Sequence, residues 1–492
     1  MMMFPDVLCF RVVHKQNSPY SKFFFIILIV LMFFLLFLQK SIMKKILFSL
    51  ASLMIGTTAF SQYWSVQNSG FANASRGISG LEVYDANTVW AFAYDGSTNS
   101  TSNIQEFTRT SNGGTTWTSG TINVGDPSLT ITNISGVSST TAWVGALAST
   151  ATDGLGAVYK TTNGGTTWTA QQPFSTFGES YLNFVHAFDS NNVIAGGDPE
   201  GGEFELYTTS NGGTSWTRVS AANVPNPLSG EYGYNSGYYA VGSNIFFYTG
   251  KGRIFKSTDK GLTWTIAFTG STYGLTDFGA TAVNGDMAWS DANRGIVMKK
   301  NFSGTGNNTT PTAIALYRTT DGGATWSTVT FTGITAANKI NDIAYVPGTN
   351  ILLATSSAGG SWKSIDNGTT WTSIDTAQHL SVRCADTSNC YSGGFNTSST
   401  VGGMFKSSQN LSVSDAIKLN KVLSIYPNPA KGEVNIKTDK KIKSSSVLDI
   451  SGRTVLSSTT QKVDVSSLAK GVYMLQVEFA DGTTSTEKLI KE

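Results

Sequence analysis

Charged residues are scarce in this chain. Asp, Glu, Lys and Arg make up 13% of its 492 residues, which is about half of the share usual in soluble domains. The formal net charge is +2, and no basic cluster occurs within residues 62–410, so the composition argues against a nucleic-acid partner. Low charge together with 51 glycines and abundant Ser, Thr and Asn is typical of a β-rich protein that works outside the cytoplasm.

Histidine is also rare. The chain has three, and His14 precedes the expected mature protein. His186 and His379 stand in or beside expected strands, where packed or half-exposed positions account for them. We therefore expect no metal site, since nitrogen ligands are so few, and we expect no cofactor.

The first 61 residues are expected to lie outside the fold. Residues 43–61 have the form of a secretory signal peptide, with Lys44-Lys45, an apolar middle and an Ala59-x-Ser61 cleavage site. Residues 1–42 hold a further apolar run, Phe23–Leu38, whose 16 residues fall short of a membrane span of about 20. Either Met43 is the true first residue, or a longer form carries an extra anchor.

Only two cysteines remain beyond the signal peptide. Cys384 and Cys390 bracket Ala-Asp-Thr-Ser-Asn, the expected turn of a hairpin. Cross-strand cysteines around a short turn in an exported protein favour a disulfide, and two reduced surface thiols are the alternative.

One short motif occurs six times. A representative copy is Tyr207-Thr-Thr-Ser-Asn-Gly-Gly-Thr-Ser-Trp216, and successive copies end on tryptophans spaced by 45 to 62 residues. Repeats of roughly 40–50 residues are typical of β-propellers, with one blade per repeat. The other five copies are Phe107–Trp117, Tyr159–Trp168, Phe255–Trp264, Tyr317–Trp326 and Trp362–Trp371.

A second periodic element lies between the motifs. It is a hairpin pattern with a polar turn, and it occurs seven times: Gly80–Phe92, Asn133–Ala146, Phe184–Gly196, Gly237–Tyr248, Ala280–Ile296, Asp342–Thr355 and Leu380–Gly394. Residues 404–410 begin like a seventh motif and stop before a tryptophan, while Gln62–Val66 resembles the missing end. If the first strand completes the last blade, Trp64 becomes the seventh tryptophan and the ring closes. The sequence therefore predicts an all-β chain with a seven-bladed propeller over residues 62–410.

The motif resembles the Asp-box, or BNR repeat, of sialidases and other propellers. The acidic position holds Asp in three copies and Asn in three: Asp259, Asp321, Asp366, Asn112, Asn163 and Asn211. Either side chain can hold a tight turn, but Asn cannot carry a catalytic proton. We therefore expect a structural role for these positions and for the tryptophans Trp64, Trp117, Trp168, Trp216, Trp264, Trp326 and Trp371.

The last seventy residues differ from the propeller in their sequence pattern. Residues 411–423 are an expected linker, and residues 424–492 show short alternating strands between Gly, Pro and Asp turns, which suit a small Ig-like β-sandwich. The Tyr426-Pro-Asn-Pro429 opening, Asp449-x-x-Gly-Arg-x-Val455 and Leu468-x-x-Gly-Val-Tyr473 resemble the type A C-terminal sorting domain of the type IX secretion system. The resemblance implies passage across the outer membrane of a Gram-negative bacterium, with type IX machinery as partner. It also implies removal of the domain, followed by release or attachment to surface lipopolysaccharide.

The propeller also resembles exported Asp-box proteins as a group, including photosystem II assembly factors and xyloglucan-degrading hydrolases. The residues that carry this resemblance are Gly197-Asp-Pro199, Pro227–Glu231 and Thr249–Asp259. Sialidase activity would need three arginines. Arg76, Arg294 and Arg383 are the propeller arginines that do not stand at or next to a repeat motif. However, the Phe-Arg-x-Pro segment of sialidases is absent.

Two carboxylates could instead serve a general glycosidase. Asp198 and Glu231 are the preferred pair among the acids outside the repeat positions, and the others are Glu200, Glu203, Glu205, Asp277 and Asp286. Each of the preferred two lies in a loop shaped by Gly and Pro. Tyr232 and Tyr234 could stack on sugar rings, although most aromatics of that stretch suit a blade core.

We therefore expect a secreted or cell-surface propeller that is a non-catalytic binding module for a glycan or a protein. The alternative is a secreted glycoside hydrolase, which would require Asp198 and Glu231 to face one cleft with carboxyl groups about 5–9.5 Å apart.

Overall fold

The structure is a computed structural model. It describes residues 63–97, 103–148, 156–172, 180–280, 282–304, 310–408, 411, 423–438, 440–449, 453–480 and 484–492. The expected signal peptide at 43–61, the preceding residues 1–42 and all of the expected linker except Leu411 and Leu423 lie outside these residues. Within the described ranges, no helix has the length and apolar character needed to cross a bilayer.

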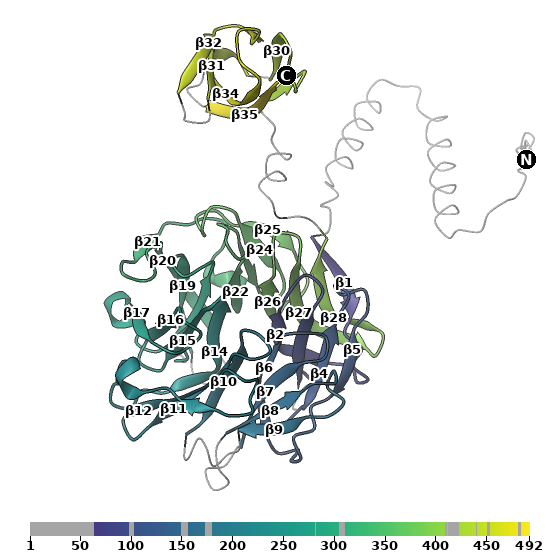
Figure 1. The fold of residues 1–492 in the computed structure, drawn as a ribbon, viewed down its shortest axis with the longest axis vertical. Coiled ribbons are helices and arrows are strands. Elements are labelled where there is room, and N and C mark those ends of the chain that lie inside the picture. The colour runs from purple at the N-terminus through teal and green to yellow at the C-terminus, as the bar shows by residue number, and fades with distance from the viewer. Residues whose placement is uncertain are drawn as a thin grey trace, which may run out of the picture. The chain divides into compact units, whose positions relative to one another are not determined.

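Seven four-stranded antiparallel blades make up the propeller (Figure 1). The first six follow chain order, and three short 3-10 helices, η2 (Ala221–Asn223), η3 (Gly270–Tyr273) and η4 (Ala336–Asn338), lie in their loops. The strands are β2 (Arg76–Val83), β3 (Val89–Asp95), β4 (Glu106–Thr110) and β5 (Thr118–Thr121); β6 (Thr130–Gly136), β7 (Ala142–Leu147), β8 (Ala157–Thr161) and β9 (Thr169–Gln172); β10 (Leu182–Ala187), β11 (Val193–Glu200), β12 (Glu203–Thr209) and β13 (Thr217–Arg218); β14 (Gly233–Val241), β15 (Asn244–Thr249), β16 (Arg253–Ser257) and β17 (Thr265–Thr269); β18 (Val283–Trp289), β19 (Gly295–Ser303), β20 (Thr310–Thr319) and β21 (Ser327–Val329); β22 (Asp342–Tyr345), β23 (Leu352–Thr355), β24 (Ser361–Ser364) and β25 (Thr372–Asp375).

The seventh blade joins the two ends of the propeller. It consists of β26 (Ser381–Cys384), β27 (Cys390–Ser398), β28 (Val401–Ser407) and the N-terminal strand β1 (Trp64–Asn68). β1 pairs with β28 in a register that sets Trp64 opposite Ser407. Neighbouring innermost strands touch all the way round the ring, from β2 through β6, β10, β14, β18 and β22 to β26 and back to β2. The predicted seven-bladed architecture is confirmed, and the ring leaves no open edge between its first and last blades.

The repeated motif forms the turn between the third and fourth strands of a blade. In the first blade, Asn112 Oδ1 accepts the Thr116 amide at 2.9 Å and Asn112 Nδ2 donates to Thr116 Oγ1 at 2.9 Å. In the fourth blade, Asp259 Oδ1 accepts the Thr263 amide at 2.9 Å and Oδ2 accepts the Thr263 hydroxyl at 2.6 Å. The threonine hydroxyl reverses its role, so Asn and Asp hold the same turn. Gly113 and Gly114 follow at φ 66° and 81°, a conformation that a side chain disfavours.

The motif turns that contain Asp should give the protein a pH-dependent stability that the turns with Asn do not give. The hydrogen bond from the Thr325 hydroxyl, followed by that from the Thr325 amide, lowers the pKa of Asp321 to about 2. Because the folded pKa lies below the unfolded value, the stabilisation is present above about pH 4 and is lost as the pH falls through about 2. We expect Asp321→Asn to leave the urea midpoint at pH 7 nearly unchanged and to reduce its fall between pH 5 and pH 3.

The reverse substitution, Asn163→Asp, is the matched control. It should add acid sensitivity of the same sign, measured in the same urea titrations. Equal acid sensitivity of Asp321→Asn and wild type would contradict this account of the turn.

Cationic side chains link most of the neighbouring blades. In four blades, the Lys or Arg three positions before the Asn or Asp of the motif donates to a backbone carbonyl in the motif turn of the following blade, and Lys406 does so from the equivalent place in the seventh blade. Lys160 Nζ, for example, lies 2.7 Å from Gly212 O and packs over the Trp143 ring. The other contacts are Arg109 to Gly164, Lys256 to Gly322, Arg318 to Asn367, and Lys406 to Gly113, the last of which crosses from the seventh blade to the first. Thr208 holds this place in the third blade, and there Lys260 of the fourth blade bonds to Asp189 at 2.8 Å instead. These cations therefore hold neighbouring blades together.

The tryptophans of the repeat differ in burial. Trp64 is fully buried, Trp168, Trp264 and Trp371 are nearly so, and Trp117, Trp216 and Trp326 are half-buried. The apolar cores lie mainly between blades. Trp90, Phe107 and Trp168, from the first two blades, pack edge to face in one such core. Because each core needs two blades, no blade can bury its apolar face alone.

Residues from 424 onward form a separate small sandwich of the Ig-like kind. One sheet has the order β29 (Ser424–Tyr426), β30 (Glu433–Lys437), β33 (Lys462–Asp464), and the other has β32 (Thr454–Ser458), β31 (Ile442–Leu448), β34 (Gly471–Phe479), β35 (Thr484–Lys491). Val434, Val447, Leu475 and Leu489 are among the residues that fill the space between the sheets. The exact boundaries of the domains remain predictions.

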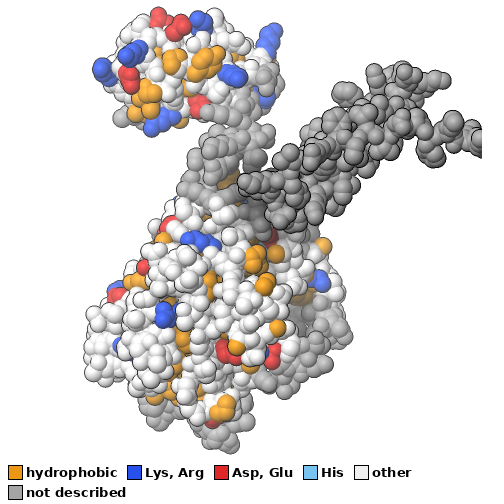
Figure 2. Space-filling model, turned by 90° about the vertical axis from the view of Figure 1, so that its right-hand side faces the viewer, with side chains coloured by type: hydrophobic (Ala, Val, Ile, Leu, Met, Phe, Trp, Pro, Cys, Tyr) orange, Lys and Arg blue, Asp and Glu red, His pale blue; other side chains and the backbone are white. Residues whose placement is uncertain are grey.

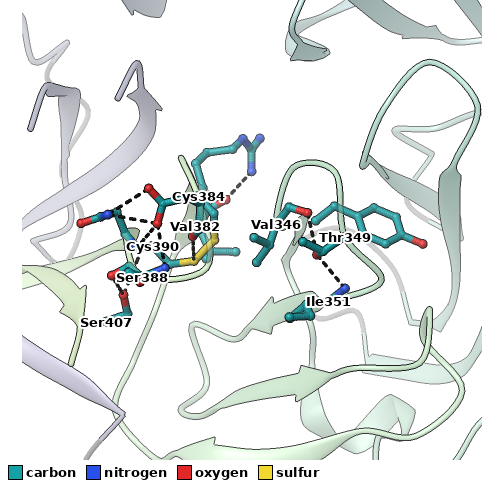
Figure 3. The surroundings of a disulfide bond; sticks show 12 residues. Val346, Thr349, Ile351, Val382, Cys384, Ser388, Cys390 and Ser407 are labelled. Carbon is teal, nitrogen blue, oxygen red and sulfur yellow. Dashed lines mark hydrogen bonds between the residues drawn. A yellow bond between two sulfur atoms is a disulfide. The ribbon is translucent and has the colours of Figure 1, made fainter. Parts of the chain in front are cut away.

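A disulfide closes the hairpin of β26 and β27. Cys384 and Cys390 stand opposite each other in the strand register and are bonded through their sulfur atoms (Figure 3). The bond lies in an apolar core with Val346, Ile351 and Val382. Ser407 Oγ accepts the Cys390 amide at 3.1 Å and donates to Ser388 O at 3.0 Å, which ties the turn to β28.

We expect the double variant Cys384→Ala/Cys390→Ala to lose about 2 kcal/mol of unfolding free energy, the low end for disulfides because the closed loop is short. Urea denaturation measures the loss. Dithiothreitol should lower the unfolding free energy of the wild type by the same amount and leave that of the variant unchanged. A reductant effect on the variant of equal size would show that the loss has another origin.

Candidate functional site

A cavity lies on the axis of the propeller, where the innermost strands meet. Its volume is about 220 Å³. Six of the seven blades contribute, and only the third does not. The lining residues are Ser79, Gly80, Leu81, Glu82, Phe92, Asn133, Ile134, Ser236, Tyr238, Tyr248, Asp286, Asn341, Asp342, Leu380, Ser381 and Arg383. Most of these side chains are polar, so the cavity suits a polar ligand.

An ion pair crosses the cavity wall between the sixth and seventh blades. Arg383 Nη1, on β26, lies 3.1 Å and 2.9 Å from the two carboxylate oxygens of Asp342, on β22. Asp342 Oδ2 also accepts the Val382 amide at 2.8 Å, and the guanidinium packs over the Tyr239 ring. The Arg383 side chain is 32% exposed, whereas that of Asp342 is 14% exposed. The guanidinium that borders the cavity is therefore held in place by an ion pair between two blades.

Two further carboxyl groups face the same cavity. Burial raises the pKa of Glu82, on β2, to about 7, although the nearby Arg383 opposes the shift. Burial, then Asp342, raise the pKa of Asp286, on β18, to about 7, against Lys300 and Arg383. Both acids therefore change charge near neutral pH, which ordinary surface carboxyls do not.

The preferred pair of the sequence analysis lies outside this cavity. Asp198 Oδ1 accepts the Asn183 amide group and the Gly233 backbone amide, both at 2.7 Å, and so joins the third blade to the fourth. The Glu231 side chain is fully buried and bonds to Arg253. Its carboxylate also accepts the Thr249 hydroxyl at 2.5 Å and the Leu228 amide at 2.8 Å. These contacts favour structural roles for both carboxylates.

Of the three arginines outside the repeat, only Arg383 lines the cavity. Arg76 binds Glu106 through two hydrogen bonds of 3.1 Å and lies 3.5 Å from Asp95, within the first blade. Arg294 Nη1 donates to Thr349 O at 3.0 Å, between the fifth and sixth blades. The structure thus separates the three side chains that a sialidase would need to bring together.

Tyr232 lies just before β14 of the fourth blade, and Tyr234 lies within that strand. Both hydroxyls donate to Asp277, that of Tyr232 at 3.3 Å, and the rings meet edge to face at 5.3 Å. Tyr232 is 40% exposed, whereas Tyr234 is half-buried. Tyr232 alone of the two presents much ring surface to solvent.

Asp375, His379 and Ser392 have the residue types of a hydrolase triad. His379 Nδ1 lies 2.9 Å from Ser392 Oγ, and Nε2 lies 2.8 Å from Asp375 Oδ1. Ser392 Oγ, however, donates to Ser381 O at 2.7 Å, and both Ser392 and His379 are fully buried. A hydroxyl that gives its proton to a carbonyl and accepts from the imidazole is not activated as a nucleophile. The group instead packs against Trp64 and Phe405 and stabilises the seventh blade.

Sequence reasoning found part of this site. Arg383 and Asp286 were among the candidates, but Glu82 and Asp342 were missed. A usable signal exists: Glu82, Asp286, Asp342 and Arg383 all stand on the first strand of a hairpin, and these strands line the axis. Among the described residues, no three His, Cys, Asp or Glu side chains are close enough to hold a metal ion.

Comparison with known proteins identifies the C-terminal part. Residues 424–492 match the family described as secretion system C-terminal sorting domain. This type IX sorting domain implies interaction with that secretion machinery and export to the cell surface or the extracellular space. No curated protein matches the chain.

Solved propellers resemble the larger part of the chain. YCF48 from Cyanidioschyzon merolae is 14% identical over 70% of this chain and 98% of that one, with a TM-score of 0.45. A GH74 xyloglucanase from Xanthomonas campestris is 12% identical over 84% and 59%, with a TM-score of 0.45. A GH93 α-L-arabinofuranosidase of Fusarium graminearum is 12% identical over 57% and 93%, with a TM-score of 0.33. Identities this low transfer no activity to this chain. The chain is an exported β-propeller protein with a C-terminal sorting domain.

Proposed function

We propose that this protein is a secreted binding protein whose propeller holds a polar ligand in the cavity on its axis. The observation that carries the proposal is the gathering of Arg383, Asp342, Glu82 and Asp286 around one cavity of about 220 Å³. Desolvated ionisable groups in a cavity mark functional sites more often than ordinary surfaces. The volume lies below the roughly 300–1,000 Å³ typical of sites for drug-sized ligands, so the bound group is small.

The proposal includes a cellular setting. Residues 43–61 direct the chain out of the cytoplasm and are removed, and residues 424–492 carry it across the outer membrane of a Gram-negative bacterium. Removal of the sorting domain then leaves the propeller free or attached to surface lipopolysaccharide. Charged side chains form only scattered spots on the propeller face in view (Figure 2). This sparse surface charge suits a location outside the cell.

A ligand screen tests the proposal. Purified protein is titrated with monosaccharides, amino sugars, amino acids and short peptides, and binding is measured by calorimetry and by the rise in melting temperature. The affinity of a cavity ligand should change in Arg383→Met, falling for an anionic or neutral acceptor group and rising for a cationic group, and it should stay unchanged in Arg76→Met, whose guanidinium lies outside the cavity. Ligands that bind both variants as well as wild type would place the binding face elsewhere on the propeller.

A secreted glycoside hydrolase is the second candidate. One observation favours it: Glu82, with a pKa near 7, shares a cavity with Asp342, which pairs with Arg383. Glycosidases use two carboxyl groups, one of which has a raised pKa. Turnover of aryl glycosides by the wild type, abolished in both Glu82→Gln and Asp342→Asn, would support this candidate. If the protein binds ligands but turns over no glycoside, only the binding function remains supported.

A further inference from the structure

The axial cavity carries more negative than positive charge. Asp342 and Arg383 neutralise each other through their two-point contact. Glu82 and Asp286 remain, and no lining residue besides Arg383 is cationic. Lys300, buried behind the wall on β19, directs its ammonium group to Ile340 O at 3.4 Å. The two remaining carboxyls thus face the cavity without a paired cation.

Both carboxyls have acceptor oxygens that the protein leaves unused. Asp286 Oδ1 accepts the Met287 amide at 2.8 Å. Asp286 Oδ2 is buried, and no described residue hydrogen-bonds to it. Glu82 makes no hydrogen bond or ion pair with any residue that the structure describes. A buried acceptor without a donor costs about 1–3 kcal/mol, so a ligand that supplies a donor there recovers that cost.

The neighbours of these carboxyls determine which donor fits. Tyr238 and Arg383 are the ionisable groups that act on Glu82, and Asp342, Lys300, Arg383, Tyr239 and Tyr248 act on Asp286. The tyrosines stay neutral because burial raises their pKa values. A ligand anion would meet two carboxylates, and Arg383 Nη1, the nitrogen nearest Asp342, is already engaged by it. A cation would meet the unused acceptors and aromatic rings.

We infer that the axial cavity binds a small ligand through a protonated primary amine, which the unpaired carboxyls of Glu82 and Asp286 attract into the cavity. The inference rests on the proposed binding function of the same cavity and names the chemistry of its ligand. An ammonium group has three hydrogen-bond donors and one positive charge, which suit two carboxylates and a lining of hydroxyl and amide groups. Amino sugars and lysine side chains both offer this group.

The experiment compares amines with their acetylated forms. Nα-acetyl-lysine amide and glucosamine carry the ammonium, while Nα,Nε-diacetyl-lysine amide and N-acetylglucosamine are the neutral counterparts. Isothermal titration of the purified protein should give at least tenfold tighter binding for one amine than for its acetylated form. Binding of the lysine derivative would identify a lysine side chain as the source of the amine, and binding of glucosamine would identify an amino sugar.

Proton linkage supplies a second readout. A lysine amine stays charged up to about pH 10, whereas the carboxyls ionise near pH 7, so its affinity should rise roughly tenfold between pH 6 and pH 8 for each participating carboxyl. Glu82→Gln and Asp286→Asn should each reduce amine affinity about tenfold or more and flatten this pH dependence. Glu200→Gln, an exposed acid outside the cavity, is the matched control. The cavity variants should fold, because each removes a desolvated charge, and circular dichroism verifies this.

The outcomes separate the two proposals. Acetylated and free amines that bind equally, or affinity that rises as the pH falls, would overturn the amine inference and leave the binding function. Neutral ligands that need Arg383 but not Glu82 would do the same. Absence of binding by every compound of the screen would count against the binding function itself.

Discussion

Trp64→Ala is expected to lower the free energy of unfolding by about 3–5 kcal/mol, the cost of removing a large buried aromatic side chain. Trp64 is fully buried at the junction where the chain closes on itself. Its indole Nε1 donates to Ser361 Oγ at 2.9 Å, and its ring contacts those of Tyr63 and His379. The substitution removes these contacts from the strand that completes the seventh blade. Urea denaturation followed by circular dichroism measures the loss.

Trp216→Ala is the matched control for this prediction. Trp216 holds the equivalent motif position in the third blade, but it is half-buried, and that blade is built from consecutive strands. We expect a loss clearly smaller than that of Trp64→Ala. Equal losses would mean that burial at the ring junction adds nothing and would contradict the closing role of β1.

Glu231→Gln is expected to cost about 3–5 kcal/mol, because it leaves the buried charge of Arg253 without its partner. Burial alone would raise the pKa of Glu231, but hydrogen bonds from Arg253, Thr249 and the Leu228 amide outweigh it and lower the pKa. The carboxylate therefore stabilises the fold above the unfolded pKa of about 4.3, and this contribution is lost as the pH falls through the folded value. Urea titrations at pH 7 and pH 3 should show the unfolding free energy of the wild type approaching that of the variant at the lower pH.

A double-mutant cycle separates the pair from the rest of the loop. Arg253→Met alone leaves the Glu231 charge buried, whereas the double variant removes both charges. We expect the double variant to lose less than the sum of the single losses. Glu200→Gln, an exposed carboxylate in the third blade, should change stability by at most about 0.5 kcal/mol. An additive cycle would contradict the ion pair as the source of the stability.

The same residue shows where prediction from sequence fails. Glu231 was chosen as a catalytic candidate because it lies in a loop shaped by proline and glycine. The structure gives its carboxylate four hydrogen-bond donors from the protein. Burial and hydrogen bonding depend on residues that are distant along the chain, so no local pattern distinguishes a buried ion pair from a catalytic acid.

Glu82 and Asp342 show the opposite failure. Each stands in an ordinary hairpin strand, and nothing in its immediate neighbours sets it apart. They become neighbours of one cavity only because the seven blades close into a ring and turn their first strands toward the axis (Figure 1). Asp286 and Arg383 appeared among the candidates, but without the ring there was no reason to join them.

The blade number, the Asn/Asp turns and the closing role of Trp64 could all be inferred from the amino-acid sequence. These features rest on short-range chemistry repeated at a regular interval, in which a side chain bonds to a backbone amide four residues away. The axial cavity, the charges around it and the burial of Glu231 were decided by the tertiary structure. They depend on which side chains from different blades meet in a region of low dielectric, and that meeting is set by closure of the ring rather than by any single repeat.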